Sequence, residues 1–337
     1  MNKKLGSILQ YVLFLGIGIF LVWWSLQQIP ADKWGEFKAA LSNARYWLVF
    51  PVFLILTASH VLRALRWKIL IEPMGYHPSL PNAFFAVMVG YLANLAVPRL
   101  GEVLKCTILA RYEKVPAQKL VGTIVAERAF DVISLALVFV LAFILQFDIV
   151  GQYAINLFQE AFQDKAGNIN ANKLVILLCI IIAIIGAIIY WFKQFAHLAI
   201  VEKIKHILLG IWEGISSVRK LRQKGLFIVY SAAIWILYIV GTWVGLFAIE
   251  ATSHLSLADA ISALAFASIG MILTPGGIGA YAFFIAKVLE LSNVPFEMGY
   301  ANGTLQWLAQ FGIVLLMGFI SLGLLPIYNR KRTHEKS

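Results

Sequence analysis

The spacing of its charged residues is the feature that most limits how this chain of 337 residues can fold. Long uncharged runs separate the charges, at residues 5–31, 46–62, 73–98, 132–147, 174–192, 225–249, 260–286 and 298–329. Most of these runs approach or exceed the roughly 20 apolar residues that cross the hydrocarbon core of a bilayer. Because 61% of the side chains are hydrophobic and only 13% are charged, the chain also lacks the polar surface of a soluble fold. The sequence therefore predicts an all-α, polytopic integral membrane protein, with 1–337 as a single membrane domain.

The distribution of basic residues predicts the topology and explains the net charge of +11. Segment 193–225 holds seven Lys or Arg against two Glu, whereas segment 148–173 is nearly balanced. Basic loops stay cytoplasmic, so we expect both termini and 193–225 to face the cytoplasm of an inner or plasma membrane, and 148–173 to face outward. The positive charge then reflects topology and attraction to the anionic inner leaflet, and a nucleic-acid partner is not expected.

These orientations predict about six full crossings and leave two apolar segments over. The first crossing is interpreted as a retained helix, because it lacks the small-x-small cleavage site of a signal peptide. Segments 81–97 and 257–274 each lie between crossings whose facing ends are on one side, cytoplasmic for the first and outer for the second. Each must therefore enter the membrane and return. The full crossings are expected at 7–28, 47–67, 122–147, 174–192, 226–250 and 304–326.

Both leftover segments run into helix-breaking sequence, Pro98-Arg99-Leu100-Gly101 in the first and Pro275-Gly276-Gly277-Ile278-Gly279 in the second. Proline and glycine disfavour a helix interior, and broken backbone at membrane depth is tolerated only inside protein or beside a water-filled cavity. The sequence thus predicts two broken, re-entrant helix pairs, at 81–115 and 257–291.

Two pairs that enter from opposite sides are typical of an inverted repeat with a site where the broken helices meet. The repeats would span 47–147 and 226–326. The alternative is that the limited identity between the two leftover segments arises by chance in a chain rich in Leu and Ala. Between the repeats, 193–225 is expected to be a basic amphipathic connector on the inner leaflet, or simply a cytoplasmic connector that is basic because it is cytoplasmic.

Charged residues beside the first break are candidates for binding chemistry. An unpaired ionised group at the bilayer centre is costly, so Arg99 and Glu102 should pair or line a wet cavity. The planar guanidinium of Arg99 matches a phosphate group, which makes this residue the first candidate for a lipid-headgroup contact. The alternative is a structural Arg99–Glu102 pair that holds the turn.

The next candidates open the helix that follows, in Glu127-Arg128-Ala129-Phe130-Asp131. Glu127 and Asp131 share a helix face, and Arg128 is close enough along the helix to pair with Asp131. These groups would bind a substrate or couple transport to protons, unless they form a structural network with Arg99 or Arg66.

Arg63 and Arg66 precede Trp67, and an ordinary belt of Arg and Trp at the membrane interface is the main competing interpretation. His60, one turn earlier, is expected to be packed or interfacial. The second break offers only backbone groups. These would form an anion site at the start of a helix over 280–291, or would permit close helix packing.

Catalytic motifs are absent from the sequence, which has no HExxH, GxSxG or GxxxxGK[ST] pattern. The two cysteines, Cys106 and Cys179, have neither CxxC spacing nor a nearby His, so no disulfide or zinc site is suggested. We therefore expect no cofactor and no metal, and favour transport over catalysis. An oligomer is compatible with these features.

Four blocks, taken in order, resemble a known family. They are "RALRWKIL" at 63–70, "NLAVPRLGEVLK" at 94–105, "AERAFD" at 126–131 and "TPGGIGAY" at 274–281. Together they are similar to the lysylphosphatidylglycerol synthase transmembrane-region family of flippase-like membrane proteins, over roughly 5–328. In bifunctional members, such a domain translocates aminoacylated phosphatidylglycerol between leaflets and a separate soluble C-terminal domain makes it. By resemblance this chain, which stops at Ser337, lacks that synthase domain.

The resemblance implies a lipid translocase, with a phospholipid-like headgroup, possibly aminoacylated or glycosylated, as its membrane-lipid partner. Two departures put the headgroup in question: Ala280-Tyr281-Ala282 stands where members often carry an acid, and 301–310 lacks the arginine often found there. The alternatives are an enzyme or accessory subunit acting on lipid-linked sugars or aminoacyl lipids, and a transporter of a soluble amphiphile. The predicted substrate-binding residues are Arg66, Arg99, Gly101, Glu102, Glu127, Arg128, Asp131, Pro275, Gly276, Gly277 and Gly279.

Overall fold

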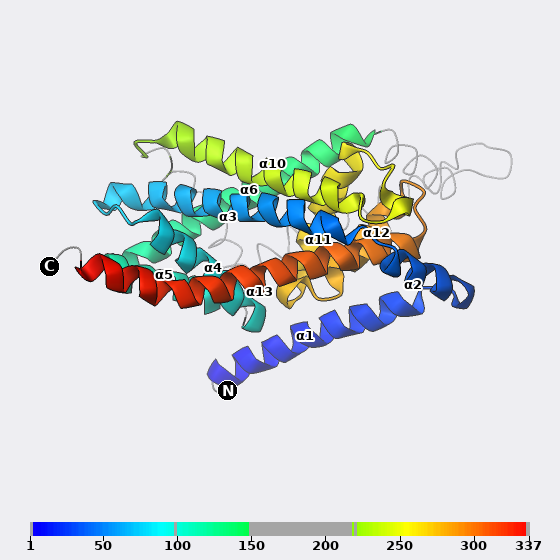
Figure 1. The fold of residues 1–337 in the computed structure, drawn as a ribbon, viewed down its shortest axis with the longest axis horizontal. Helices are drawn as coiled ribbons and strands as arrows, with labels where there is room; N and C mark the ends of the chain where they lie inside the picture. The colour runs from blue at the N-terminus through cyan, green and yellow to red at the C-terminus, as the bar shows by residue number, and fades with distance from the viewer. Residues whose placement is uncertain (1–2, 98–99, 148–217, 219–220, 335–337) are drawn as a thin grey trace, which may run out of the picture.

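The computed structural model describes residues 3–97, 100–147, 218 and 221–334, and every regular element within them is a helix. Four of these helices are long and apolar enough to cross a membrane. They are α3 (Val49–Ile71), α6 (Ala117–Leu145), α10 (Lys224–Leu246) and α13 (Phe296–His334). In Figure 1 they run along the long axis of the molecule, side by side. The predicted all-α, polytopic membrane class is confirmed.

The N-terminal region precedes this bundle. Helix α1 (Lys3–Gln27) contains the crossing expected at 7–28, and its residues Leu15–Gln27 form a shorter apolar segment. It packs beside the later broken pair and is followed by η1 (Ala31–Lys33), α2 (Trp34–Ser42) and η2 (Tyr46–Leu48). The crossing expected at 174–192 and most of the connector at 193–225 lie outside the described residues.

Two broken helix pairs lie between the long helices (Figure 1). After η3 (Glu72–Met74), α4 (Leu80–Ala96) runs to the middle of the bundle, and α5 (Leu100–Glu113) returns to the end where α3 finishes. After η4 (Glu250–Thr252), α11 (Leu257–Leu273) enters from the opposite end, turns at η5 (Pro275–Gly277), and α12 (Ala280–Glu290) returns there. The two pairs therefore approach each other from opposite ends.

Local sequence explains where these helices begin and stop. Ser256 caps α11, because its side chain accepts from the backbone N–H of Asp259 while the Asp259 carboxylate accepts from the backbone of Ser256. Pro81 lies in the first turn of α4, where its missing N–H costs nothing. At the second break, Gly276 has a φ of 61°, which only glycine adopts without strain.

Helix contacts show an exchange symmetry. Helices α3 and α10 pack against each other, α4 packs against α13, and α11 packs against α6. The four helices of the first half, α3 to α6, can be matched in order with the four of the second half, α10 to α13. Under this matching the α4–α13 contact becomes the α11–α6 contact, and the α3–α10 contact becomes itself. That is the pattern expected of an inverted repeat. The repeat boundaries at 47–147 and 226–326 remain predictions.

Polar side chains fasten both ends of the bundle in a related way. At one end Asn82 of α4 donates to Glu113 of α5 at 2.6 Å and to Asn329 of α13 at 2.9 Å. At the other end, Gln146 after α6 donates to Asp259 of α11 at 3.0 Å, and Ser292 after α12 also donates to Asp259. We call these clusters the first clasp (Ser79, Asn82, Glu113 and Asn329) and the second clasp (Gln146, Ser256, Asp259 and Ser292).

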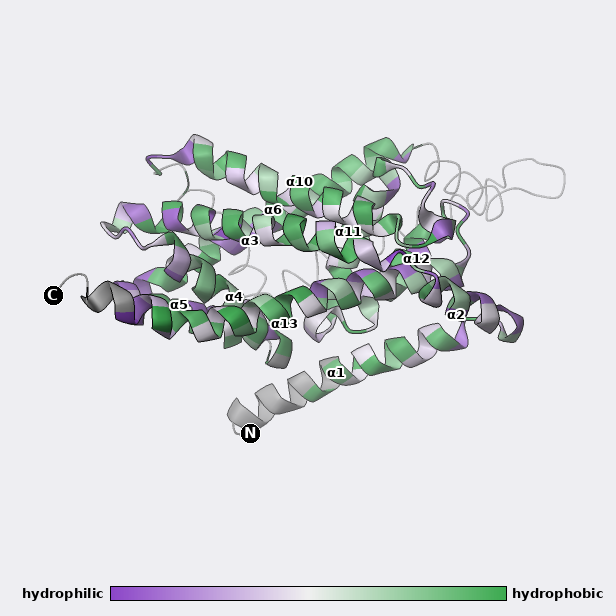
Figure 2. Cartoon of the chain, viewed as in Figure 1, coloured by the Kyte–Doolittle hydropathy of each residue, from purple (hydrophilic) through white to green (hydrophobic). Residues whose placement is uncertain are grey.

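Side-chain hydropathy agrees with a membrane-embedded bundle. Hydrophobic residues cover the middle of the long helices, and hydrophilic ones gather toward their ends and in the loops (Figure 2). Many large apolar side chains, such as Leu137, Phe143 and Phe319, remain exposed on the outer surface. In a soluble monomer such extensive exposure would be unfavourable, whereas lipid tails cover it.

Candidate functional site

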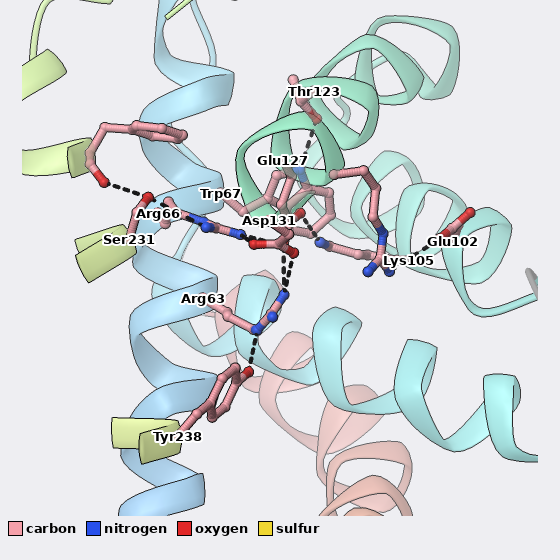
Figure 3. A network of polar contacts seen from close by, with 12 residues as sticks. Arg63, Arg66, Trp67, Glu102, Lys105, Thr123, Glu127, Asp131, Ser231 and Tyr238 are labelled. Atoms are coloured by element: carbon pink, nitrogen blue, oxygen red, sulfur yellow. Dashed lines mark hydrogen bonds and ion pairs between the residues drawn. The ribbon is translucent and has the colours of Figure 1, made fainter. Parts of the chain in front are cut away.

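A network of buried ion pairs lies between α3, α5 and α6 (Figure 3). Arg66 Nη2 lies 2.8 Å from Asp131 Oδ1, and Arg63 Nη1 lies 3.0 Å from Asp131 Oδ2. Lys105 Nζ lies 2.6 Å from Glu127 Oε2, and Arg66 also reaches the other carboxylate oxygen of Glu127 at 3.4 Å. All five side chains are at least 87% buried, since the most exposed, Asp131, has a side-chain exposure of 13%.

Helix periodicity places these charges together. Arg63 and Arg66 are three apart on α3, and Glu127 and Asp131 are four apart on α6, so each pair occupies one helix face. An unpaired charge at this depth would be costly, and mutual pairing offsets much of that cost. The Lys105 ammonium also lies 4.1 Å from the centre of the Trp67 ring, a favourable cation–π distance.

A second, more open ion pair adjoins the network. Arg128 Nη2 lies 3.1 Å from Glu102 Oε1, and these side chains are 48% and 34% exposed. Glu102, Glu127 and Arg128 border a small hollow beside Gly101 and Lys105. The pairing of Arg128 with Asp131 that their spacing allows is not used, because Asp131 is held by Arg63 and Arg66 from α3.

A large cavity of about 1560 Å³ adjoins this hollow, since Tyr91, Asn94 and Arg128 line both. It reaches from η2 and the start of α3 to the middle of the bundle, and the second break, with Gly276, forms part of its wall. Exposed apolar side chains border it, including Phe50, Ile272 and Leu316. Its polar lining residues are Arg45, Tyr46, Trp47, His60, Arg63, Tyr91, Asn94, Arg128, Asp131, Trp235, Tyr238, Thr242, Ser268, Thr274, Tyr281, Gln306 and Gln310.

Three buried polar atoms in this cavity wall have no hydrogen-bond partner among the described residues. They are Nδ1 of His60, Nε1 of Trp235 and Oε1 of Gln310. His60 is 8% exposed and packs against the Tyr91 ring, so it is a packed rather than an interfacial histidine. Buried polar groups are usually satisfied, so these three atoms are exceptions to that rule within the cavity wall.

The predicted site residues fall into three groups. Arg66, Glu127 and Asp131 meet in the buried network, and Glu102 and Arg128 pair beside it. Arg99 lies outside the described residues. Gly101, Pro275, Gly276, Gly277 and Gly279 lie at the two breaks.

Close backbone packing occupies the glycines at the breaks. A Cβ at Gly101 would overlap the carbonyl oxygen of Gly90 on the facing arm, and the Gly101 N–H donates to Asn94 Oδ1 at 2.8 Å. At the second break the N–H groups of Gly277 and Ile278 bond to backbone carbonyls within the turn. A Cβ at Gly279 would lie 2.5 Å from the carbonyl oxygen of Gly18 on α1, so the second break also makes a close backbone contact. An anion site at the start of α12 stays a prediction.

Sequence reasoning missed two members of the network. Arg63 is not among the predicted site residues, and an interfacial belt is the competing interpretation for it, but it is 7% exposed and its Nε donates to the Tyr238 hydroxyl at 2.7 Å. Lys105 was not considered, although it lies in the same block as Glu102. The available signal was its position four residues after Gly101, in a helix that the break carries to membrane depth. Within the described residues, no three His, Cys, Asp or Glu side chains gather as a metal site would require.

Comparison with known proteins gives the family. A model of the lysylphosphatidylglycerol synthase transmembrane region matches residues 8–318. The chain belongs to this family. A second match is to UPF0104 membrane protein MJ1595 of Methanocaldococcus jannaschii, 26% identical over 129 residues, which are 37% of this chain and 36% of that protein. The aligned part thus covers about a third of the curated relative. No solved structure matches the chain.

Within this member of the lysylphosphatidylglycerol synthase transmembrane-region family, the four charged residues of the cavity lining all come from the first 131 residues of the chain. Val115-Pro116 before α6 corresponds to Val294-Pro295 before α13. Counted from these prolines, Gln306 and Gln310 occupy the positions of Glu127 and Asp131. The α13 wall of the cavity thus carries neutral amides where the α6 helix carries acids.

Proposed function

We propose that the protein translocates a membrane lipid between leaflets, with the headgroup passing through the large cavity. The observation that carries this proposal is the continuity of the cavity, which joins exposed apolar helix surface to a charged inner end. A phospholipid has the same division, since its tails are apolar and its headgroup is charged. The family's name, which refers to a lipid synthase, supports a lipid-related role.

The dimensions of the cavity favour a large amphiphile over a small solute. Small-molecule sites commonly enclose about 300–1,000 Å³, and this cavity is larger, at about 1560 Å³. Its apolar border, formed by residues such as Phe50, Ile272 and Leu316, would let lipid tails remain in the bilayer while the headgroup enters.

The buried network forms the inner end of this cavity. The lining reaches Arg63 and Asp131, beyond which Arg66, Lys105 and Glu127 are packed against the core formed by Trp67, Leu109 and Leu120. Passage to the other leaflet therefore needs a second conformation in which this packing opens. The two predicted repeats make equivalent helix contacts. If each repeat adopted the conformation of the other, the cavity would close at its present mouth and open at the opposite end of the bundle. With the predicted orientation, the cavity described here faces outward.

A leaflet-sidedness assay in proteoliposomes tests the proposal. Fluorescent phospholipid placed in one leaflet is followed by a membrane-impermeant quencher, with wild-type protein, Arg128→Gln, Glu102→Gln and Lys287→Gln. Lys287 pairs with Glu290 and does not line the cavity, so its variant is the control. We expect wild type and the control to move lipid. Arg128→Gln removes a charge from the cavity lining, and Glu102→Gln removes the carboxylate that holds Arg128 there, so both variants should be slower. Equal rates in all four proteins, or wild-type rates no faster than protein-free vesicles, would refute the proposal.

The same vesicles address the enzymatic alternative. Lipid extracted after the assay and analysed by mass spectrometry should be chemically unchanged if the protein is a translocase. A covalently modified lipid formed only with wild-type protein would instead indicate an enzyme.

A further inference from the structure

We propose that the cavity selects a headgroup carrying an anionic phosphate ester and discriminates against a net cationic, aminoacylated headgroup. This inference rests on the proposed lipid function and names the substrate class of the same site. It starts from the formal charges that line the cavity within the described residues. These are three arginines, Arg45, Arg63 and Arg128, and one carboxylate, Asp131.

Asp131 is not free to bind a ligand's ammonium group. Both of its carboxylate oxygens are occupied, one by Arg66 at 2.8 Å and the other by Arg63 at 3.0 Å. A cationic headgroup that approached Asp131 would meet the positive charges of Arg63 and Arg66, or would have to displace one of these buried arginines and leave it unpaired at membrane depth. Removing one partner of a buried ion pair is strongly unfavourable.

Arginine groups, by contrast, remain available to an anion. Arg128 is paired only with Glu102 among the described residues, its side chain is 48% exposed, and it faces the cavity. Arg45, at the outer mouth, donates to the carbonyl of Phe247 and has no carboxylate partner in the described part of the chain. A guanidinium binds phosphate through two parallel hydrogen bonds, so these two residues can receive a phosphate ester at the mouth and at the inner end.

The opposite wall supplies no carboxylate that could rescue a cationic ligand. Gln306 and Gln310 of α13 line it at the positions that Glu127 and Asp131 hold on α6, and Gln310 Oε1 has no partner among the described residues. After the second break the chain reads Ala280-Tyr281-Ala282, also without an acid. The neutral wall can hydrogen-bond glycerol or sugar hydroxyls, but it does not attract a positive charge.

The apolar border of the cavity favours a lipid as the source of the phosphate ester. Binding measurements can distinguish a lipid from a soluble phosphate ester. The full chain in detergent is titrated with phosphatidylglycerol, with its lysyl ester of the same acyl chains, and with glycerol phosphate, using native mass spectrometry. We expect phosphatidylglycerol to bind about tenfold more tightly than the lysyl ester, a difference equivalent to one well-placed charge contact. Glycerol phosphate should compete only weakly.

Two cavity variants and one control sharpen this experiment. Arg128→Gln should lower the affinity for phosphatidylglycerol, and Gln310→Glu, which changes the charge with almost no change in shape, should shift the preference toward the lysyl ester. Arg111→Gln, on an exposed arginine that does not line the cavity, should leave the preference unchanged. Because Gln310→Glu tests for a changed ligand ratio, loss of folding cannot imitate the expected result.

The outcomes separate this inference from the proposed function. Tighter binding of the lysyl ester, or equal binding of both lipids, would overturn the anionic selectivity even if lipid is translocated. Glycerol phosphate binding as tightly as the lipid would overturn the lipid assignment. Selective binding of phosphatidylglycerol without translocation would support the selectivity and refute the translocase proposal.

Discussion

Arg66 of α3 places Nη2 2.8 Å from Oδ1 of Asp131 on α6, and the Arg66 side chain has no solvent exposure. The two residues are 65 positions apart in the sequence. Their ion pair joins the helix before the first broken pair to the helix after it. The stability of this junction is therefore the first property to test.

Replacing Asp131 with Asn should destabilise the fold. The substitution leaves Arg63, Arg66 and Lys105 facing Glu127 alone, and breaking a buried pair in this way costs about 3–5 kcal/mol. Unfolding in a graded detergent–denaturant titration would measure the change. Glu36→Gln is the matched control, because it removes one partner of the exposed Lys33–Glu36 pair and exposed pairs contribute about 0–1 kcal/mol. Similar effects for the two variants would contradict a structural role for the network.

The contact between the arms of the first pair can be tested with a single methyl group. Gly101→Ala would force its Cβ onto the carbonyl oxygen of Gly90, and overpacking of this kind costs about 1–3 kcal/mol. Gly122→Ala is the control, since a Cβ there meets no heavy atom within 4 Å. We expect a lower melting temperature in detergent only for Gly101→Ala. An unchanged melting temperature for that variant would show that the two arms do not pack as described.

Asn82 and Asn329 should be energetically coupled through the first clasp. Their side chains exchange hydrogen bonds at 2.9 and 2.7 Å, each amide nitrogen donating to the other's oxygen. A double-mutant cycle of Asn82→Ala and Asn329→Ala should therefore give a coupling of about 0.5–3 kcal/mol. Additive effects would mean that α4 and α13 are not joined here. Asn82→Ala combined with Ser253→Ala provides the uncoupled comparison, because Ser253 bonds only locally to Glu250.

The two ends of α3 should label from opposite sides of the membrane. Asn43 precedes η2 and His77 follows η3, so the two residues flank opposite ends of α3, and both side chains are exposed. In cells, a membrane-impermeant maleimide should modify Asn43→Cys directly and His77→Cys only after permeabilisation. Cys106 is buried, which limits its background labelling, and both variants are made together with Cys179→Ser to remove the other native thiol. The reverse pattern would invert the predicted orientation, and labelling of both from outside would contradict a crossing by α3.

The broken pairs were predictable because their signals are local. The segments expected at 81–97 and 257–274 correspond to α4 at Leu80–Ala96 and α11 at Leu257–Leu273. Proline, glycine and the ends of uncharged runs act through the backbone of their own neighbourhood, so they mark helix ends without tertiary information. The positions of the basic loops, which stay cytoplasmic, predict from which side of the membrane each pair enters.

The site was harder to predict because its pairings are not local. Spacing along α6 permits a pair between Arg128 and Asp131, but Arg63 and Arg66 reach Asp131 from another helix and Arg128 turns to Glu102. Lys105 joins Glu127 only because the break places α5 beside α6. A single sequence shows which charges lie at membrane depth, whereas helix packing decides which of them meet.

The glycine contact between α4 and α5 also constrains how the molecule can move. Where Gly101 meets Gly90 no side chain separates the two backbones, so neither arm can slide past the other without a steric clash. The arms are therefore expected to move as one rigid body. Any opening at their end of the bundle must occur on the outer faces of the pair, where it meets α3, α6 and α13 through side chains. Substitutions that trap a single conformation should concentrate on those outer faces.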